Sequence, residues 1–403
     1  MVISLPDRAG RPADAERLPV VRGGPEVRVG LAVNAASVSI GGGAPVRITG
    51  SDGNLTAVPG GVVWRAVRAG DGVALVGDGG ERISPARSLV VAPATDAGLV
   101  RIGTREYRGV VSIVTARSGV SAINRVGMEE YLVSVVGSEM GRRTVEEAEA
   151  LKAQAIVSRT YALRTRGRWR ADGFDYYATV ADQVYLGAGA EHSLARDAVA
   201  ATAGTIVSQG GAPIDAFFFS TCGGRTERGT EVFRAASGAY LRSVADVAPD
   251  GRVWCEISPR YRWHEEWDLE ALRATLRRHL PVKAGITPGR VTRIRDVRIA
   301  DRTESGRVRQ LTVVLPDGEV AVPSPSVREV LRPASGEILR STAFSLRATS
   351  ANGEVTHLSV EGSGAGHGVG FCQWGAIGRA RAGQRYPEII AAYYPGTGLE
   401  RFY

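Results

Sequence analysis

Hydrophobic and polar residues follow two different spacings along this chain. From Val27 to about Val126, short runs rich in valine and isoleucine alternate with polar residues and are interrupted by glycines, as in VRVGLAV and GVVSIV. A period of two with closely spaced turn residues is typical of antiparallel strands. The pattern predicts a small β domain at residues 27–104, followed by a last pair of strands that runs into Val126.

A helical spacing begins further along the chain. Thr144 and Glu147 form a capping box, which is a signal for a helix start, and Gly167 offers a stop for that helix. Further helices are predicted at residues 192–203, at 268–280 before Pro281, and in short stretches that begin at Pro325 and Pro387.

Strand patterns return in the C-terminal half. A hairpin is predicted at residues 205–224, two strands at 291–322 around the turn DRTESGR, and a further strand at 344–361. The fold class is therefore predicted to be α+β. Residues 1–26, rich in Pro, Asp, Arg and Gly, are predicted to be a mobile leader. Residues 105–403 are predicted to form one mixed α+β domain.

Composition limits the classes of function. The 403 residues favour two domains or one domain with insertions. The net charge of +8 favours acidic partners such as nucleic acid, anionic lipid or anionic glycan. No basic run with interleaved aromatic residues is present, so nucleic acid is not the first choice. The sequence also shows no apolar stretch of signal-peptide length at its start and none of the ~20 residues of a membrane helix.

Glu139 is the first candidate for chemistry. It follows an apolar run and two small residues, Gly137 and Ser138. Desolvation raises the pKa of a carboxyl group and can turn it into a general acid near neutral pH. The alternative is an ordinary solvated residue at a helix end. Lys152 and Arg159 are seven residues apart on the next helix, where they line the same cleft or belong to a solvated charged face.

Two glycine-containing segments are further candidates. GSGAGHGVGFCQWG (362–375) frames His367 with glycines, either to hydrogen-bond a polar ligand or to form a tight packed turn. In STCGG (220–224), Ser220 or Cys222 is a possible nucleophile, although no G-x-S-x-G motif surrounds Ser220. A buried turn of small residues is the alternative for this segment.

The three cysteines, Cys222, Cys255 and Cys372, are far apart and form no CxxC pair. Spacing leaves three interpretations open. They are independent buried thiols, a disulfide with one thiol left over, or ligands of a zinc ion together with a histidine such as His264.

Several segments together resemble the SpoIID/LytB family, which comprises sporulation stage II protein D and amidase enhancers. They are, in the family's order, EEYLVSVVGSEM, EALKAQAIVSRTYAL, DQVYLG, PIDAFFFSTCGGRTE, YLRSV and GAGHGVGFCQWGAIGRARAGQRYPEIIAAYYPGT. They cover residues 105–403. The N-terminal β region also resembles the leader domain often found in this family.

The resemblance implies a peptidoglycan lytic transglycosylase acting outside the cytoplasm. Such an enzyme cleaves MurNAc–GlcNAc bonds in glycan strands that lack stem peptides and leaves 1,6-anhydro-muramic ends, with Glu139 as general acid and base. Hydrolysis would normally need a second carboxylate, for which Asp182 and Glu227 are the candidates. The alternative is a non-catalytic cell-wall protein that enhances an N-acetylmuramoyl-L-alanine amidase.

The resemblance also implies roles for other residues. Lys152, Arg159 and Tyr161 are expected to bind substrate or support the acid. The C-terminal segments are expected to form the other wall of one groove, lined by Ser220, Thr226, His367 and Gln373. The reaction requires no cofactor. A structural zinc ion at Cys222, Cys255 and Cys372 is a further expectation, although Phe217–Phe219 stand where many relatives carry a histidine.

Overall fold

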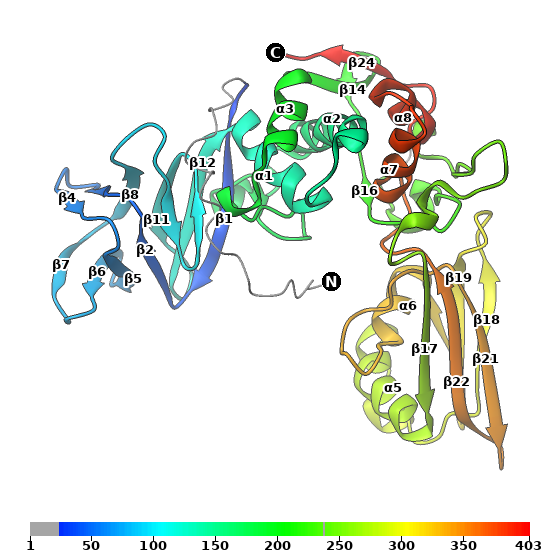
Figure 1. Cartoon of the computed structure of the whole chain (residues 1–403). Helices are drawn as coiled ribbons and strands as arrows, with labels where there is room; N and C mark the ends of the chain where they lie inside the picture. The colour runs from blue at the N-terminus through cyan, green and yellow to red at the C-terminus, as the bar shows by residue number, and fades with distance from the viewer. Residues whose placement is uncertain (1–23, 237) are drawn as a thin grey trace. The chain divides into compact units, whose positions relative to one another are not determined.

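The computed structural model describes residues 24–236 and 238–403 (Figure 1). Its described residues form two compact units, an N-terminal unit of residues 24–213 with 399–403 and a C-terminal unit of residues 214–398. Both contain helices and strands, so the predicted α+β class is confirmed. The predicted leader, residues 1–26, lies almost entirely outside the described residues. The boundary near residue 104 stays a prediction.

Two sheets occupy the first part of the N-terminal unit. The seven-stranded sheet has the order β13-β1-β12-β11-β8-β3-β4, and the six-stranded sheet has the order β10-β9-β2-β5-β6-β7. The pairs are antiparallel as predicted, except that β13 runs parallel to β1. The strands are β1 (Glu26–Ala35), β2 (Ser37–Gly41), β3 (Val46–Gly50), β4 (Leu55–Val58), β5 (Val63–Ala69), β6 (Gly72–Gly77), β7 (Arg82–Ala86), β8 (Ser88–Pro93), β9 (Val100–Ile102), β10 (Arg105–Tyr107), β11 (Val110–Thr115), β12 (Val120–Gly127) and β13 (Tyr176–Tyr177).

Helices follow directly after β12. The sequence pattern predicts a first helix at Thr144, whereas α1 begins earlier, at Met128. Most of α1 is buried, so its apolar residues lack the one-sided spacing that signals a surface helix. The capping box of Thr144 and Glu147 is present, and Gly167 follows the end of α2 with a φ of 77°. The elements are α1 (Met128–Met140), η2 (Val145–Glu147), α2 (Ala148–Thr165), η3 (Arg170–Asp172), η4 (Ala188–Ala190), α3 (Ser193–Ala201), β14 (Thr205–Gln209), β15 (Ala212–Pro213) and β24 (Gly398–Arg401).

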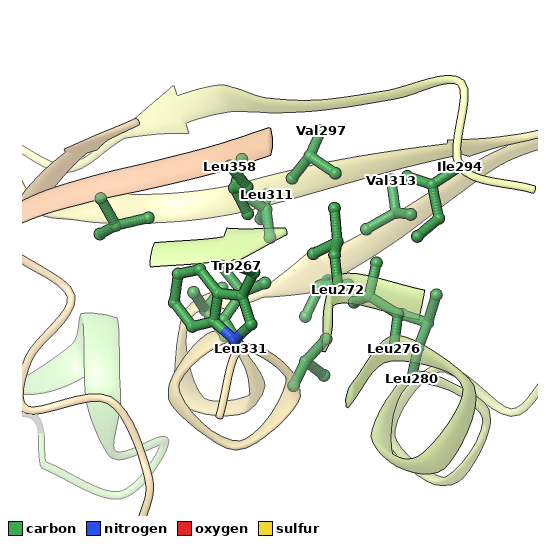
Figure 2. Close-up of a cluster of buried hydrophobic side chains, with 14 of the residues drawn as sticks. Trp267, Leu272, Leu276, Leu280, Ile294, Val297, Leu311, Val313, Leu331 and Leu358 are labelled. Atoms are coloured by element: carbon green, nitrogen blue, oxygen red, sulfur yellow. The ribbon is translucent and has the colours of Figure 1, made fainter. Parts of the chain in front are cut away.

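The C-terminal unit contains two three-stranded sheets, β17-β22-β21 and β18-β19-β20, and a short parallel pair of β16 and β23. Leucines of α5 point toward strand residues in one buried core around Trp267 (Figure 2). The elements are β16 (Phe218–Phe219), α4 (Gly229–Val232), η5 (Ala239–Leu241), η6 (Trp254–Ile257), β17 (Arg262–Asp268), α5 (Leu269–Ala284), η7 (Pro288–Arg290), β18 (Asp296–Arg302), β19 (Val308–Leu315), β20 (Gly318–Pro323), α6 (Ser324–Val330), β21 (Phe344–Ala351), β22 (Glu354–Ser363), β23 (Phe371–Cys372), α7 (Gln373–Arg381) and α8 (Tyr386–Tyr393).

Three sequence predictions are wrong in detail in this unit. Helix α5 continues past Pro281 to Ala284 and is capped by Gly285, whose φ is 66°. Proline removes one backbone donor, and here the apolar face of the helix remains packed on the core. Residues 291–322 contain parts of three strands rather than two, and 344–361 is a hairpin that turns at Asn352.

Candidate active site and a buried cysteine cluster

Glu139 lies half-buried in the last turn of α1. Its Oε1 accepts a hydrogen bond of 2.9 Å from the backbone N–H of Val184, in the segment that carries the DQVYLG motif. The preceding residue, Ser138, accepts a bond of 3.2 Å from Leu186 N–H. These two contacts fix the end of α1 against the motif and thereby orient the carboxylate.

The same segment holds α1 along its length. Ser134, one turn before Ser138, donates to the carbonyl oxygen of Gly187 over 2.8 Å. Gly137 lets the backbones approach closely, because a Cβ there would lie 2.0 Å from the carbonyl oxygen of Ala190. The small residues before Glu139 therefore serve close packing. This close packing brings the DQVYLG segment next to the end of α1, where Glu139 lies.

Lys152 and Arg159 differ in their surroundings on α2. The Lys152 ammonium lies 2.7 Å from Glu149 Oε1, and its side chain is 27% exposed. Arg159 is fully buried, and its guanidinium donates to both oxygens of Glu129 over 2.8 and 2.6 Å. The expected roles are substrate binding and support of the acid. The buried pair of Arg159 with Glu129 favours support of α1, the helix that carries Glu139, whereas the partial exposure of Lys152 is compatible with substrate binding.

Tyr161 and Asp182 belong to one hydrogen-bond cluster. The Tyr161 hydroxyl donates to Asp182 Oδ1 over 3.3 Å, and burial raises the pKa of Tyr161 to about 12. Asp182 also accepts bonds from Arg168, from the Trp169 indole and from the backbone N–H of Tyr177. Both oxygens of Asp182 are thus engaged by donors of the protein.

Ser220 and Thr226 lie in the C-terminal unit. The Ser220 hydroxyl is half-buried and lies 3.1 Å from the Thr221 hydroxyl. Thr226 is buried and accepts a bond of 2.9 Å from Val244 N–H, so it fixes the turn after STCGG. Gln373 is the first residue of α7 and is buried as well.

His367 makes hydrogen bonds to the backbone through both ring nitrogens. Its Nε2–H donates to the carbonyl oxygen of Phe218 over 2.9 Å, and its Nδ1 accepts from Val369 N–H over 3.1 Å. Burial, with the ring packed beside Phe219 and Phe233, lowers the pKa of His367 to about 3. The imidazole is therefore neutral at physiological pH. These contacts favour the packed-turn interpretation of the segment over ligand binding.

The glycines around His367 support the same conclusion. Gly366 and Gly370 have φ values of 109° and 78°, which side-chain-bearing residues rarely adopt. A Cβ on Gly370 would lie 2.2 Å from the carbonyl oxygen of Phe217, and one on Gly364 would lie 2.4 Å from that of Thr221. The glycines allow this segment to pack directly on the strand that leads into STCGG.

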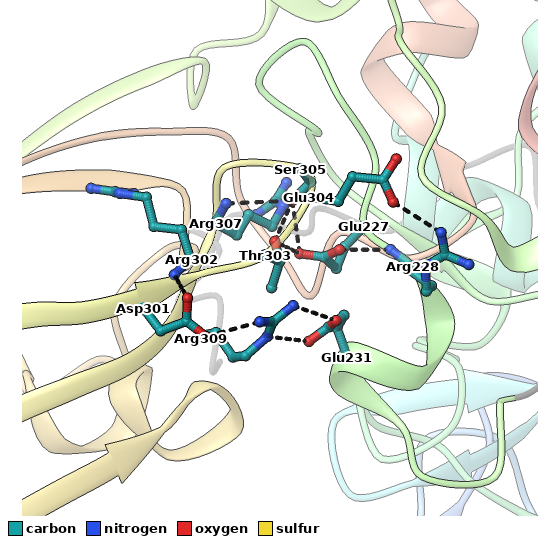
Figure 3. Close-up of polar contacts among 10 residues, drawn as sticks. All are labelled: Glu227, Arg228, Glu231, Asp301, Arg302, Thr303, Glu304, Ser305, Arg307 and Arg309. Atoms are coloured by element: carbon teal, nitrogen blue, oxygen red, sulfur yellow. Dashed lines mark hydrogen bonds and ion pairs between the residues drawn. The ribbon is translucent and has the colours of Figure 1, made fainter.

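Glu227 is also engaged by the protein. Its Oε2 accepts bonds from the Thr303 and Ser305 hydroxyls over 2.6 and 2.7 Å, and its Oε1 accepts from Arg228 N–H over 2.7 Å (Figure 3). This buried carboxylate joins the chain after STCGG to the turn between β18 and β19. The contacts favour a structural role for Glu227.

The three cysteines converge in the C-terminal unit, as the resemblance predicts. Cys222, Cys255 and Cys372 are all buried, and their sulfur atoms and one carboxylate oxygen of Asp246 lie within 4.8 Å of one another. The Cys222 and Cys255 sulfurs are 3.4 Å apart. Hydrogen bonds from the Cys222 and Cys372 thiols lower the pKa of Cys255 to about 3.

Asp246 completes this group and was not found from the sequence. Its Oδ2 faces the thiols, with Cys222 Sγ at 3.1 Å, while its Oδ1 accepts from the Arg379 guanidinium and from the Tyr393 hydroxyl. Burial raises the pKa of Asp246. His264, the histidine considered as a fourth ligand, is exposed instead and lies 2.8 Å from Glu266.

Three thiols and a carboxylate are a set that zinc accepts in tetrahedral geometry, with Zn–S distances of about 2.3 Å. A tetrahedron of that size places sulfurs roughly 3.8 Å apart, close to the separations in this cluster. The residues present therefore fit a structural zinc ion.

Two segments of the chain match models of known protein families. Residues 116–208 match the family model described as "Stage II sporulation protein", named SpoIID, so the chain carries a SpoIID domain that includes Glu139. Residues 250–370 match a second family, described as a domain of unknown function, DUF8618.

Individual relatives extend the similarity over most of the chain. It is 29% identical over 310 residues to Stage II sporulation protein D of Bacillus subtilis (strain 168), covering 72% of this chain and 79% of that protein. It is 26% identical over 277 residues to the amidase enhancer of the same organism, covering 63% of this chain and 38% of that protein. An uncharacterized protein of Brachyspira hyodysenteriae is 29% identical over 297 residues. The resemblance to the SpoIID/LytB family is confirmed.

The two sets of predicted groove residues fall in different units. Glu139, Lys152, Arg159 and Tyr161 lie in the N-terminal unit, and Ser220, Thr226, His367 and Gln373 lie in the C-terminal unit. A groove shared by the two sets stays a prediction. Among the described residues, no helix is long and apolar enough to cross a membrane.

Proposed function

We propose that this protein is a lytic transglycosylase of peptidoglycan. It would cleave the MurNAc–GlcNAc bond in glycan strands without stem peptides and act outside the cytoplasm. The observation that carries the proposal is Glu139, a half-buried carboxylate held by Val184 N–H inside the SpoIID domain. The relatives named for sporulation and amidase enhancement support a role at the cell wall.

One carboxyl group is sufficient for this reaction. Protonated Glu139 donates its proton to the glycosidic oxygen as the bond to muramic C1 breaks. The resulting carboxylate then takes the proton from the muramic C6 hydroxyl, whose oxygen closes onto C1. The product is a 1,6-anhydro ring, the acid is regenerated, and no water is consumed.

The surroundings of Asp182 and Glu227 support a lyase over a hydrolase. Hydrolysis would need a second carboxylate to activate water or to attack C1. Both candidates already accept several hydrogen bonds from protein groups that hold loops in place. Such a carboxylate is poorly placed to take a proton from water.

Digestion of purified stripped strands by the full chain tests this proposal. Mass spectrometry should find anhydro-muramic ends with wild type and none with Glu139→Gln. Glu146→Gln, an exposed glutamate on η2, is the matched control and should retain activity. Products whose muramic residue has a reducing end would contradict the lyase. Equal activity of wild type and Glu139→Gln would contradict the assignment of Glu139 as the acid.

The second candidate is a non-catalytic enhancer of an N-acetylmuramoyl-L-alanine amidase, favoured by the similarity to a protein named amidase enhancer. An assay of peptide release from intact cell walls by a purified amidase, with and without this protein, distinguishes the two functions. An enhancer accelerates peptide release equally well with wild type and with Glu139→Gln. A lyase forms anhydro ends without any amidase.

We also propose that Cys222, Cys255, Cys372 and Asp246 hold a structural zinc ion. Four protein ligands, all buried, fit a closed structural site rather than a catalytic one. Metal analysis should find one zinc per chain, lost in Cys222→Ser. Two thiols fewer than expected without metal would indicate a disulfide, and three reactive thiols without metal would refute both.

A further inference from the structure

An open pocket of about 990 Å³ lies within the C-terminal unit, and Cys222 of the cysteine cluster is among the residues that line it. It is bounded by the turn after Cys222, by the β18–β19 turn and by the adjoining ends of β17, β21 and β22. Four arginines line it, namely Arg225, Arg262, Arg302 and Arg307, and we call it the arginine pocket. Among its described lining residues, Glu361 is the one acid.

One of the four arginines, Arg225, lies 3.9 Å from a carboxylate oxygen of Glu304. Among the described residues, the other three form no ion pair with a carboxylate. Arg302 donates to the backbone carbonyls of Gly306 and Phe344 over 2.7 and 3.0 Å. These acceptors are neutral, so they do not offset the positive charge of the guanidinium. Arg262 is exposed, and its guanidinium lies 4.6 Å from the centre of the Tyr261 ring. The pocket therefore presents a field that attracts an anion.

Arg307 is the strongest single observation. Its side chain is 1% exposed, and its Nη2 donates to the carbonyl oxygen of Cys222 over 2.7 Å. Its Nε and Nη1 have no hydrogen-bond partner among the described residues. A buried guanidinium with unmatched donors is costly, because such groups are normally paired.

The turn that carries Arg307 is held in place. Thr303 and Ser305, just before it, both donate to the buried Glu227 carboxylate (Figure 3). On the other side, Gly368 packs against the guanidinium, and a Cβ there would lie 2.8 Å from its Cζ. The cation is therefore positioned before any ligand arrives, which lowers the entropic cost of binding.

Hydroxyl groups share the pocket with the arginines. Ser305, Ser345 and Ser363 line it together with Gly306 and Gly362. Guanidinium groups recognise carboxylates, and hydroxyls together with peptide groups recognise sugar hydroxyls and acetamides. A saccharide that carries a carboxylate matches both kinds of group.

We propose that the arginine pocket binds the lactyl carboxylate of a muramic acid residue from which the stem peptide has been removed. This inference rests on the proposed function, because it takes the same stripped strand as ligand. It assigns glycan recognition to the region that matches the domain of unknown function. A lactyl group still joined to a peptide has no free carboxylate, so the pocket would select stripped strands.

Binding of two tetrasaccharides to the full chain tests the proposal, in a Glu139→Gln background that prevents cleavage. One is the stripped MurNAc–GlcNAc repeat, and the other contains GlcNAc alone and lacks only the lactyl groups. By calorimetry, the muramic ligand should bind at least tenfold more tightly. Arg302→Gln and Arg262→Gln should each remove most of that difference.

Arg298→Gln is the matched control, because Arg298 lies on the same strand as Arg302, outside the pocket, where it pairs with Glu319. It should leave binding unchanged. Equal affinity for both saccharides would overturn the proposal, as would equal losses in Arg298→Gln and Arg302→Gln. Displacement of the muramic ligand by an equal concentration of inorganic phosphate would show a general anion site and refute the lactyl assignment.

These results are distinguishable from a failure of the proposed function. If wild type forms no anhydro ends yet prefers the muramic ligand through its arginines, the proposed lytic activity is refuted and the proposed role of the arginine pocket is supported. If anhydro ends form and Arg302→Gln changes neither affinity nor KM, the arginine pocket is refuted and the enzyme stands.

Discussion

Glu129 and Arg159 form a fully buried ion pair that joins α1 to α2 through two hydrogen bonds of 2.8 and 2.6 Å. Gly204 N–H and the Tyr403 hydroxyl also donate to Glu129. Glu139 lies at the far end of α1 from Glu129, so this pair determines how the helix that carries the proposed acid is held.

Arg159→Met should therefore destabilise the N-terminal unit strongly. It leaves the Glu129 carboxylate buried without its cation, which costs about 3–5 kcal/mol. Lys152→Met is the control on the same helix, since its half-exposed pair contributes at most about 1 kcal/mol. Urea unfolding of the two variants measures the difference. A stable Arg159→Met that has lost glycan binding would instead assign Arg159 to the substrate.

The second prediction concerns the support of the proposed zinc site. The Tyr393 hydroxyl donates to the Asp246 oxygen that faces away from the thiols, over 2.9 Å. Tyr393→Phe should weaken zinc binding about 10- to 100-fold, because groups that orient a ligand tune metal affinity. Competition with a chromogenic chelator measures this loss.

Tyr394→Phe is the matched control for that experiment. The neighbouring Tyr394 hydroxyl donates to the carbonyl oxygen of Phe217 instead of to Asp246. Its loss should leave metal affinity within about twofold of wild type, below the range expected for a ligand-orienting group. Equal affinities for both tyrosine variants would show that Asp246 does not depend on the bond from Tyr393.

The sequence predicts elements whose signals are local. The capping box of Thr144 and Glu147, the stop signal at Gly167 and the alternation of the N-terminal strands all act within a few residues, and each is present in the structure. Helix α1 escaped prediction because burial on most sides removes the spacing that marks a helix face.

The candidate sites depend on contacts between distant residues. Asp246 becomes a partner of Cys222 and of Arg379 only when segments far apart in the chain fold together. No spacing rule finds such a group. For His367 the sequence leaves ligand binding and a packed turn both open, and only the structure shows that two backbone groups hold its ring.

The third prediction compares two glycines with nearly equal backbone angles. Gly368 has a φ of 90° and packs against Arg307, whereas Gly383 has a φ of 85° and enough open space that a Cβ there would meet nothing within 4 Å. Gly383→Ala should cost about 1 kcal/mol, the strain of the left-handed region alone. Gly368→Ala should cost about 1–3 kcal/mol more through the clash, typical of overpacking. Equal losses in urea unfolding would show that Arg307 moves aside freely.

The last prediction concerns the pH dependence of stability through His367. Its folded-state pKa of about 3 lies below the ordinary value of 6.5. Between these two pH values the unfolded chain binds a proton at His367 and the folded chain does not. The contribution of the neutral His367 ring to the free energy of unfolding is complete above pH 6.5. It is lost as the pH falls from 6.5 toward 3, with a slope of up to about 1.4 kcal/mol per pH unit. His367→Gln keeps a donor and an acceptor but does not titrate. Urea unfolding between pH 4 and 8 should show that the stability advantage of wild type over this variant shrinks in acid. An advantage that stays constant with pH would mean that the folded protein protonates His367, and that the two backbone bonds and the neighbouring phenylalanines do not keep the ring neutral.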